Sequence, residues 1–469
     1  MQRVCPTPLD ASTSEIGVKS PDGPILFAST ARAGQINPLL SIARELSERA
    51  VPALWFASTD DRRADIEAAT VDTPVRFVSY GAADLTKELI REPSIYAAIT
   101  QGPLTTGSFL VTLRWLFDRE RLAAEYQRML AHIDHVQPRL MIIDLSTTSA
   151  LNAAMARRIP FILSVPCTPS ALFVGRLPWD YPALGSGLPR QMSAKQKLAN
   201  LWYQVRLRIA QVTRFPFLSF AAVRMAMGIA NPFGSLARYS DAAIAIFCYS
   251  VFGLEYPFRA PSHLYLLGAM VPSALPATQD SKDELSQWLD SHPAVIYVGL
   301  GTLVRLSQVQ ITALVTAFGR LAPNHHILWK LPDSQWALLP PGESLPINLR
   351  IAHWVPSQLD VLAHPNVRVF LTHGGGNGFH EGIYFGKPLL VMPFWLDCFD
   401  FAVRAIDSGV GLALDRPPAF TADEVATKLE RLLTDSSFHE KARYWGEQLR
   451  KAGGVSRAAD LILRMLNRS

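Results

Sequence analysis

The segment from Trp354 to Glu381 carries side chains and turns suited to holding an anionic ligand. Gly374–Gly376 lets backbone approach a ligand closely, and a helix that starts near Asn377 would point its N–H groups and positive dipole end at it. A diphosphate fits such a turn, with His373 beside it. Glu381, one turn into the helix, can accept hydrogen bonds from a sugar diol, and Trp354 offers a flat face to a nucleobase. The spacing favours a nucleotide-containing ligand.

The elements that must position these side chains alternate between short apolar runs and amphipathic stretches, as in strand–helix–strand units with parallel sheets. Val367–Leu371 is typical of a strand buried on both faces, and it places His373 at its carboxyl end, where open α/β sheets bind ligands. The first half of the chain repeats the pattern, with a strand at Leu140–Ile143 that ends at Asp144.

The predicted fold class is therefore α/β, with two facing Rossmann-like domains, parallel sheets and an interdomain cleft. We expect a polar tail at 1–23, an N-terminal domain at 24–256, a linker at 257–285 and a C-terminal domain at 286–469, whose last helix could pack back on the N-terminal domain. With 469 residues, the chain is long enough for two separate cores.

The motifs of the second half follow one another in an order that resembles the donor-binding signature of the UDP-dependent glycosyltransferases, family 1 type, which have the GT-B fold. That signature reads roughly W-x-P-Q, T/S-H-x-G-x-N-[SG]-x-x-E, G-x-P and P-x-x-x-D-Q. The matching positions here are Trp354, Val355, Pro356, Thr372, His373, Gly375, Asn377, Gly378, Glu381, Gly386, Pro388, Pro393, Asp397 and Cys398. Further likeness lies at Gly34–Pro38, Asp144, Glu255 and Gly301–Thr302.

The resemblance implies a role for each matched residue. His373 and Thr302 would hold the diphosphate, Trp354 would stack on the base, Glu381 would bind ribose hydroxyls and Asp397 would contact the sugar. The other implied donor-binding positions are Gly301, Val355, Gln358, Gly375, Asn377, Gly378 and Cys398.

The implied activity is inverting transfer of a sugar from a nucleotide sugar, expected to be UDP-linked, to a small lipophilic acceptor. Apolar and aromatic segments such as Phe109–Phe117 and Pro166–Phe217 would line the acceptor site in the N-terminal domain and suit a terpenoid, sterol or polyketide. The alternatives are a GDP- or TDP-sugar donor, a carboxylate acceptor, or a non-catalytic nucleotide-sugar-binding accessory protein.

One departure from the family pattern concerns catalysis. The family's catalytic histidine is replaced by Gln35, whose amide cannot take a proton, and the first histidine in the chain is His132. Asp144, which matches the aspartate that orients the family's histidine, could act directly or through water while Gln35 orients the acceptor. Otherwise the acceptor needs little help, a base such as His132 or His135 comes from elsewhere, or the protein binds donor and turns over poorly.

Two other departures concern the donor. The family's D-Q pair is Asp397-Cys398 here, and a thiol is a weak hydrogen-bond donor beside an amide, so glucose is not assumed. The chain also has one residue more between Trp354 and Gln358 than the W-x-P-Q pattern. The sequence contains no D-x-D motif for a metal-bound diphosphate, so we expect no metal and no cofactor, with the nucleotide sugar as substrate.

A basic amphipathic stretch interrupts the α/β alternation at about 182–240. It has no Asp or Glu, and its cationic residues, interleaved with large apolar ones, are Arg190, Lys195, Lys197, Arg206, Arg208, Arg214, Arg224 and Arg238. Three interpretations remain open: a solvated helix that covers the core, a lid on an apolar pocket, or weak contact with a membrane surface through residues 190–238.

Composition sets the remaining expectations. With 49% hydrophobic residues, 18% charged residues and a formal charge of +5, the chain is not intrinsically disordered and is too weakly basic to indicate nucleic acid. Its four scattered cysteines exclude a disulfide scaffold. No apolar leader or anchor stands out, which predicts a cytoplasmic protein. We also expect a monomer or a homodimer.

Overall fold

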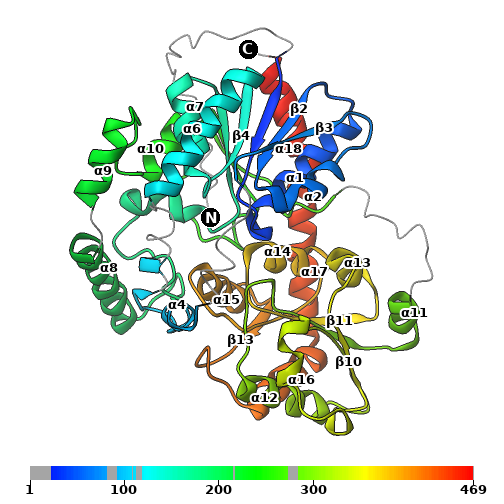
Figure 1. The fold of residues 1–469 in the computed structure, drawn as a ribbon. Helices are drawn as coiled ribbons and strands as arrows, with labels where there is room; N and C mark the ends of the chain where they lie inside the picture. Colours follow the sequence, from blue (N-terminus) through cyan, green and yellow to red (C-terminus); the bar gives the residue numbers. More distant parts are fainter. Residues whose placement is uncertain are drawn as a thin grey trace, which may run out of the picture.

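The computed structural model describes residues 23–81, 92–107, 109–111, 119–214, 217–272 and 284–467. Nearly all of the tail expected at 1–23, the middle of the expected linker and most of the 109–117 segment lie outside these residues. The described part contains a parallel sheet of seven strands and a parallel sheet of six, each flanked by helices (Figure 1). This is the predicted two-domain α/β architecture.

The seven-stranded sheet belongs to the N-terminal domain and has the order β3-β2-β1-β4-β5-β6-β7. Its strands are β1 (Ile25–Ala28), β2 (Leu54–Ser58), β3 (Val75–Ser79), β4 (Leu140–Asp144), β5 (Phe161–Val165), β6 (Ala245–Cys248) and β7 (Leu264–Leu266). Every residue of β1, β4, β5 and β6 is buried, as expected for apolar runs covered on both faces. Strand β7 lies inside the range expected for the linker, so the sheet extends past residue 256.

The helices of this domain cover both faces of the sheet. They are α1 (Ala33–Glu48), α2 (Arg63–Glu67), α4 (Pro93–Ile99), α6 (Arg119–Val136), α7 (Thr148–Arg157), α8 (Ala194–Arg214), α9 (Phe217–Ala226) and α10 (Leu236–Ala242), with short 3-10 turns at Asp60–Arg62 and Pro169–Arg176.

The six-stranded sheet belongs to the C-terminal domain and has the order β10-β9-β8-β11-β12-β13. Its strands are β8 (Val295–Gly299), β9 (His326–Lys330), β10 (Leu349–Ala352), β11 (Val367–Thr372), β12 (Leu389–Val391) and β13 (Gly411–Ala413). The helices are α11 (Glu284–Ser291), α12 (Gln308–Arg320), α13 (Gln358–Ala363), α14 (Gly376–Tyr384), α15 (Asp397–Asp407), α16 (Ala422–Thr434), α17 (Ser436–Lys451) and α18 (Gly454–Leu466), with 3-10 turns at Asp333–Leu338 and Gly342–Ser344.

Each sheet separates two apolar cores, because successive strand residues point to opposite faces. In β4, Ile142 belongs to the core under α1, whereas Ile143 belongs to the core under α7. In β11, Leu371 and Phe370 divide between the two cores of the C-terminal domain in the same way. This alternation fixes the register of the strands and the position of the residues at their carboxyl ends.

The carboxyl edges of the two sheets face each other. The Asn377 side-chain amide, in the first turn of α14, donates a 3.3 Å hydrogen bond to the carbonyl of Ala33, at the start of α1. Since α14 follows β11 and α1 follows β1, the openings of the two central strand–helix turns meet between the domains, as Figure 1 shows.

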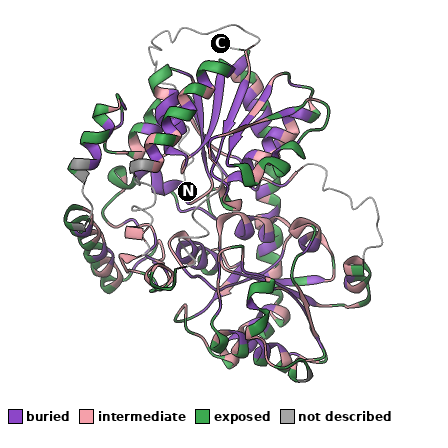
Figure 2. Ribbon diagram, in the orientation of Figure 1, coloured by how far each residue is buried: buried purple, intermediate pink, exposed green. Residues whose placement is uncertain are grey.

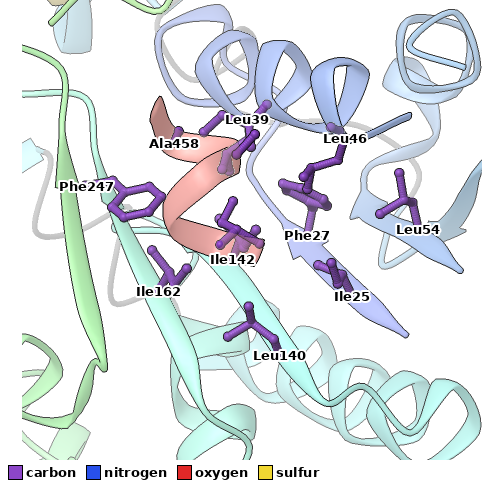
Figure 3. Packing of buried hydrophobic residues seen from close by; sticks show 14 of the residues in the cluster. Ile25, Phe27, Leu39, Leu46, Leu54, Leu140, Ile142, Ile162, Phe247 and Ala458 are labelled. Carbon is purple, nitrogen blue, oxygen red and sulfur yellow. The ribbon is translucent and has the colours of Figure 1, made fainter. Parts of the chain in front are cut away.

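The last helix, α18, packs on the N-terminal domain. Ala458 and Ile462 lie in the core formed by α1 and the first sheet, and Figure 3 shows Ala458 beside Leu39 and close to Phe247. At the surface, Arg49 of α1 forms an ion pair with Asp460, with 2.5 Å between Nη1 and Oδ1. The chain therefore crosses from the C-terminal domain back to the N-terminal one.

Helices α8 and α9 occupy the outer margin of the N-terminal domain and carry many exposed side chains (Figure 2). They form most of the basic stretch expected at 182–240. None of the helices in the described ranges is both long and apolar enough to cross a bilayer.

Candidate active site

The turn between β11 and α14 is built from glycines that allow close packing around His373. Gly374 has a φ of +78°, which favours glycine, and a Cβ there would lie 2.6 Å from Val391 Cγ1. A Cβ on Gly375 would lie 2.5 Å from His373 Nε2. Gly375 is also the N-cap of α14 and offers no side-chain acceptor, so the first N–H groups of α14 are left for a ligand or water.

The imidazole of His373 lies close to the backbone of two glycines. A Cβ on Gly301, in the loop after β8, would lie 2.7 Å from Cε1 of the ring, and one on Gly375 would lie 2.5 Å from Nε2, so a larger residue at either position would displace the ring. Burial, with Lys330 nearby, lowers the pKa of His373 to about 4, so the ring is neutral at pH 7. Its Nδ1 is buried and hydrogen-bonds to no described residue. The ring is fixed in place with an unused polar atom, as a ligand-binding imidazole requires. Thr302 is exposed in the same loop, next to Gly301.

A second group of side chains lies one turn further along α14. The Gln358 side-chain amide donates a 2.7 Å hydrogen bond to Glu381 Oε2, while its oxygen accepts one of 3.3 Å from the Tyr297 hydroxyl. Burial raises the pKa of Glu381, and Gln358 and then Lys330 oppose the rise. Gln358 thus orients the carboxylate, and the extra residue after Pro356 has not removed it from the site. Gln358 is the first residue of α13. Ser357 caps this helix, because its side chain accepts a hydrogen bond from the Asp360 amide.

Trp354 and Lys330 lie beside this group. The Lys330 Nζ is 5.2 Å from the centre of the Trp354 ring, and burial lowers the pKa of Lys330 while Glu381 opposes the shift. Trp354 is 60% exposed and lies just after β10, a half-buried strand at the edge of the sheet. A wide, exposed aromatic face next to a buried carboxylate and a cation suits a base and its ribose. Lys330 was not predicted from the sequence. The feature that marks it there is its position at the carboxyl end of an apolar strand.

Two residues expected to bind the donor have buried side chains, and two others lie in the first turn of α14. Val355 and Cys398 are buried, with 2% and 1% exposed, so only their backbone can face a ligand. Gly378 sits under the turn, where a Cβ would lie 3.3 Å from Thr372 Oγ1. Asn377 bonds across to the N-terminal domain, as described above.

Asp144 lies at the carboxyl end of β4 with no exposed surface. Its Oδ2 accepts a 3.0 Å hydrogen bond from the Thr147 hydroxyl, while Oδ1 is buried and hydrogen-bonds to no described residue. Burial raises the pKa of Asp144 to about 6, and Arg32 is the largest opposing influence. Asp144 is thus ionised at pH 7 but is more basic than an ordinary aspartate.

Arg32 connects the two halves of the site and was missed from the sequence. It opposes the rise in pKa of Asp144 and also that of Asp397, whose pKa burial raises to about 6. Arg32 is the N-cap of α1, and Gln35 is half-buried in the first turn of the same helix. A carboxylate from each domain, one guanidinium and the start of α1 therefore lie near the contact between α1 and α14.

The histidines considered as alternative bases belong to another part of the domain. His132 Nε2 lies 2.7 Å from the carbonyl oxygen of Ser79, at the end of β3, and His135 packs its edge on Trp55 of β2. Strand β3 is three positions from β4 in the sheet order, or roughly 14 Å at the usual strand spacing. Neither histidine is brought to Asp144.

A buried polar network joins the two domains. Arg404 of α15 binds Glu255 with 2.5 Å between Nη2 and Oε1, and both side chains are almost fully buried. In the same helix, the Asp400 carboxylate accepts backbone hydrogen bonds from Gly185 (2.8 Å) and Gly187 (3.1 Å) of the N-terminal domain. Burial raises the pKa of Asp400 to about 7. The segment 185–187 is thereby held beside the start of α15, where Asp397 lies. Glu255 stood out in the sequence, but Asp400 and Arg404 did not.

The donor side of the site combines an anion-binding turn, an imidazole and a carboxylate beside an aromatic face, and a buried aspartate lies across from it. Among the described residues, no three His, Cys, Asp or Glu side chains are grouped closely enough to hold a metal ion.

Known structures share this arrangement of domains. The glycotransferase of kitacinnamycin superposes with a TM-score of 0.66 over 94% of this chain and 98% of its own, at 21% identity. The calicheamicin glycosyltransferase CalG4 superposes with a TM-score of 0.64 over 95% of this chain and 98% of its own, also at 21% identity. At such low identity the likeness shows the fold alone, which is GT-B.

Relatives in sequence cover less of the chain. The mouse (Mus musculus) UDP-glucuronosyltransferase 3A2 is 30% identical over 184 residues, which are 39% of this chain and 34% of that protein. UDP-glucosyltransferase 2 of Dactylopius coccus is 27% identical over 205 residues, 42% of this chain and 36% of that protein. The chain thus aligns with about a third of the length of these relatives. The sequence model of the family described as "UDP-glucoronosyl and UDP-glucosyl transferase" matches residues 126–446, more than half of the chain, so the protein belongs to this family.

Proposed function

We propose that the protein is an inverting glycosyltransferase that transfers a sugar from a UDP-sugar to a small lipophilic acceptor. The observation that carries the proposal is the position of His373, packed against Gly301 and Gly375 at the uncapped start of α14, with Glu381 and Trp354 beyond it. These groups match the order of diphosphate, ribose and base in a nucleotide. Membership of the family, with its UDP-glucuronosyl and UDP-glucosyl transferases, supports a UDP-linked donor.

The donor would lie along the carboxyl edge of the second sheet. Its diphosphate would accept hydrogen bonds from the first turn of α14, from Thr302 and from one ring nitrogen of His373, whose neutral form at pH 7 carries a single N–H. The ribose hydroxyls would donate to Glu381, held in place by Gln358, and the base would stack on Trp354. Asp397, next to the segment 185–187, would contact the sugar.

Transfer would then be a single in-line displacement. The acceptor oxygen forms a bond to the anomeric carbon while the bond from that carbon to the diphosphate oxygen breaks, which inverts an α-linked donor to a β-glycoside. The acceptor proton passes to Asp144, directly or through a water, and Gln35 orients the acceptor. The charge on the departing diphosphate is stabilised by α14, His373 and Thr302, with no metal and no cofactor required.

Asp144 is favoured as the base by its buried, unpartnered Oδ1 and its raised pKa. The apolar and aromatic character of residues 166–193, which precede α8, favours a lipophilic acceptor of the terpenoid, sterol or polyketide kind. Most of the large apolar side chains of α8 itself are exposed and do not contribute to this argument.

Isothermal titration calorimetry with UDP and a panel of UDP-sugars tests the donor assignment directly. We expect His373→Ala to weaken UDP binding about 10- to 150-fold, the range for loss of a hydrogen bond to a charged group. His325→Ala is the matched control. This histidine directly precedes β9, so it lies at the amino-terminal end of the strands, whereas His373 lies at their carboxyl end. Absence of affinity for UDP and every UDP-sugar would refute the proposal. Binding without transfer to any acceptor in a lipophilic library would leave the accessory-protein alternative.

A further inference from the structure

Helix α8 turns a row of large apolar side chains away from the protein. Between 36% and 78% of the surface of each is exposed, and they are Leu198, Leu201, Trp202, Val205, Ile209 and Val212. At about 100° per residue, these six positions fall within an arc of roughly 100°. The buried positions Asn200, Tyr203 and Ala210 lie on the opposite side of the helix and pack on the domain. The apolar row, here called the α8 stripe, therefore lies on the side of the helix that faces away from the described core.

Cationic side chains border the α8 stripe on both sides. The same helical geometry places Lys195 and Arg206 along one border and Lys197 and Arg208 along the other. The sequence has no Asp or Glu anywhere from residue 182 to residue 240. An apolar row between two cationic rows is the pattern of a helix that lies in a lipid–water interface, with its cations at the level of the headgroups.

Neighbouring residues continue the apolar surface. Trp179 is 62% exposed and is linked to α8 through its carbonyl, which accepts a hydrogen bond of 3.4 Å from the Gln204 side chain. In α9, which follows α8, Leu218 and Met225 are 81% and 63% exposed. Figures 1 and 2 show α8 and α9 at the same outer margin of the N-terminal domain.

We propose that the α8 stripe docks the protein on the surface of a bilayer that contains anionic phospholipids. With 21 residues, α8 is about 31 Å long, and lying parallel to the membrane it would insert its apolar side chains without spanning the bilayer. A second copy of the chain fits the surface less well, because a symmetric pair joined through this stripe would bring the cationic borders of both copies together.

The inner side of α8 is connected to the candidate active site. The Asn200 side chain accepts a hydrogen bond from the Ala183 amide (2.9 Å) and donates one to the Tyr181 carbonyl (2.8 Å). The segment that follows donates its Gly185 and Gly187 amides to Asp400 of α15. Docking would thus place the wall of the site next to a lipid phase, where a lipophilic acceptor is concentrated. This last consequence rests on the proposed function, whereas docking itself does not.

Vesicle sedimentation tests the docking without any turnover. The full chain is mixed with vesicles of phosphatidylcholine alone and with vesicles that also contain phosphatidylserine. We expect binding to the second kind, and about 30-fold weaker partitioning for the double variant Lys195→Gln/Arg208→Gln, which removes one cation from each border. Trp202→Gln/Ile209→Gln should abolish binding at low and high salt. Val309→Gln/Ile347→Gln, which alters residues 80% and 97% exposed on the C-terminal domain, should bind like the wild type.

Three results would overturn the docking proposal. The first is that the protein does not bind phosphatidylserine vesicles, and the second is that the Trp202→Gln/Ile209→Gln variant binds them as well as the wild type does. The third is that the wild type is a dimer in lipid-free sedimentation velocity and this variant is a monomer. The last result would assign the stripe to a second copy of the chain. Because vesicle binding and UDP binding are measured separately, failure of either leaves the other standing.

Discussion

Replacing Asp144 by asparagine should remove catalysis and at the same time stabilise the protein. Burial raises the pKa of this carboxyl to about 6 from its ordinary value of 3.8. A raised acid pKa means that the folded protein prefers the neutral form. The ionised carboxylate therefore costs stability above about pH 6, and the cost disappears as the pH falls toward 3.8. The pKa difference corresponds to at most about 3 kcal/mol.

The two effects call for two assays on the same Asp144→Asn protein. In urea unfolding at pH 8, we expect the variant to be more stable than the wild type, by up to about 3 kcal/mol, and the difference should shrink at pH 4.5. In steady-state kinetics, kcat/KM should fall about 10²- to 10⁴-fold, the usual contribution of a general base. The wild-type kcat/KM should rise with pH through about 6, as the carboxylate ionises, and this ionisation should be missing from the residual activity of the variant.

Asp134→Asn provides the control. Asp134 belongs to the same domain but is solvent-exposed and paired with Arg157, so its loss should change neither the kinetics nor the pH profile. If the Asp144→Asn variant kept the kcat/KM of the wild type at every pH, Asp144 would not be the base. Destabilisation of this variant at pH 8 would contradict the conclusion that burial raises the pKa of Asp144 more than Arg32 and Thr147 lower it.

The remaining predictions concern the donor site and the domain contact. Trp354→Ala should weaken binding of UDP about 5- to 150-fold, which is the range for loss of stacking on one base. The affinity for inorganic diphosphate should not change. Equal loss of affinity for both ligands would contradict a stacking role. Arg404→Leu should lower the free energy of unfolding by about 3–5 kcal/mol, because it leaves Glu255 buried without its cation. Arg431→Leu, at an exposed position of α16, should change it by less than about 1 kcal/mol. Similar losses for the two variants in urea unfolding would show that the Arg404 pair contributes little.

Much of the fold and of the donor site could be predicted because parallel strands place the residues that follow them at the same edge of a sheet. Apolar runs that end in polar residues identified β4 with Asp144 and β11 with His373, and parallel strands bring such ends to one edge. The helical spacing from His373 to Glu381 then fixed the second polar position. Gln358 was uncertain because of the extra residue after Pro356, and the structure places it on Glu381 because Ser357 caps a new helix there.

The residues that were missed have partners far away in the chain. Arg404 pairs with Glu255, 149 residues earlier, and Asp400 accepts from Gly185, 215 residues earlier. Lys330 and Arg32 are single charges whose neighbours come from other elements, so no local spacing marks them. Conversely, Val355 and Cys398 fitted a motif but face the core, because a motif specifies a position along the chain and not the direction of a side chain.

The return of α18 to the N-terminal domain means that the two lobes are joined by two covalent crossings. One crossing leaves β7, and the other runs from α17 into α18, where the Gly454 amide donates a 2.7 Å hydrogen bond to the carbonyl of Leu267. That bond therefore places the two crossings side by side. The two lobes also meet where the Tyr96 hydroxyl of α4 donates a 2.8 Å hydrogen bond to the carbonyl of Arg305, in the loop after β8, so the lobes are tied both at the crossings and at this loop.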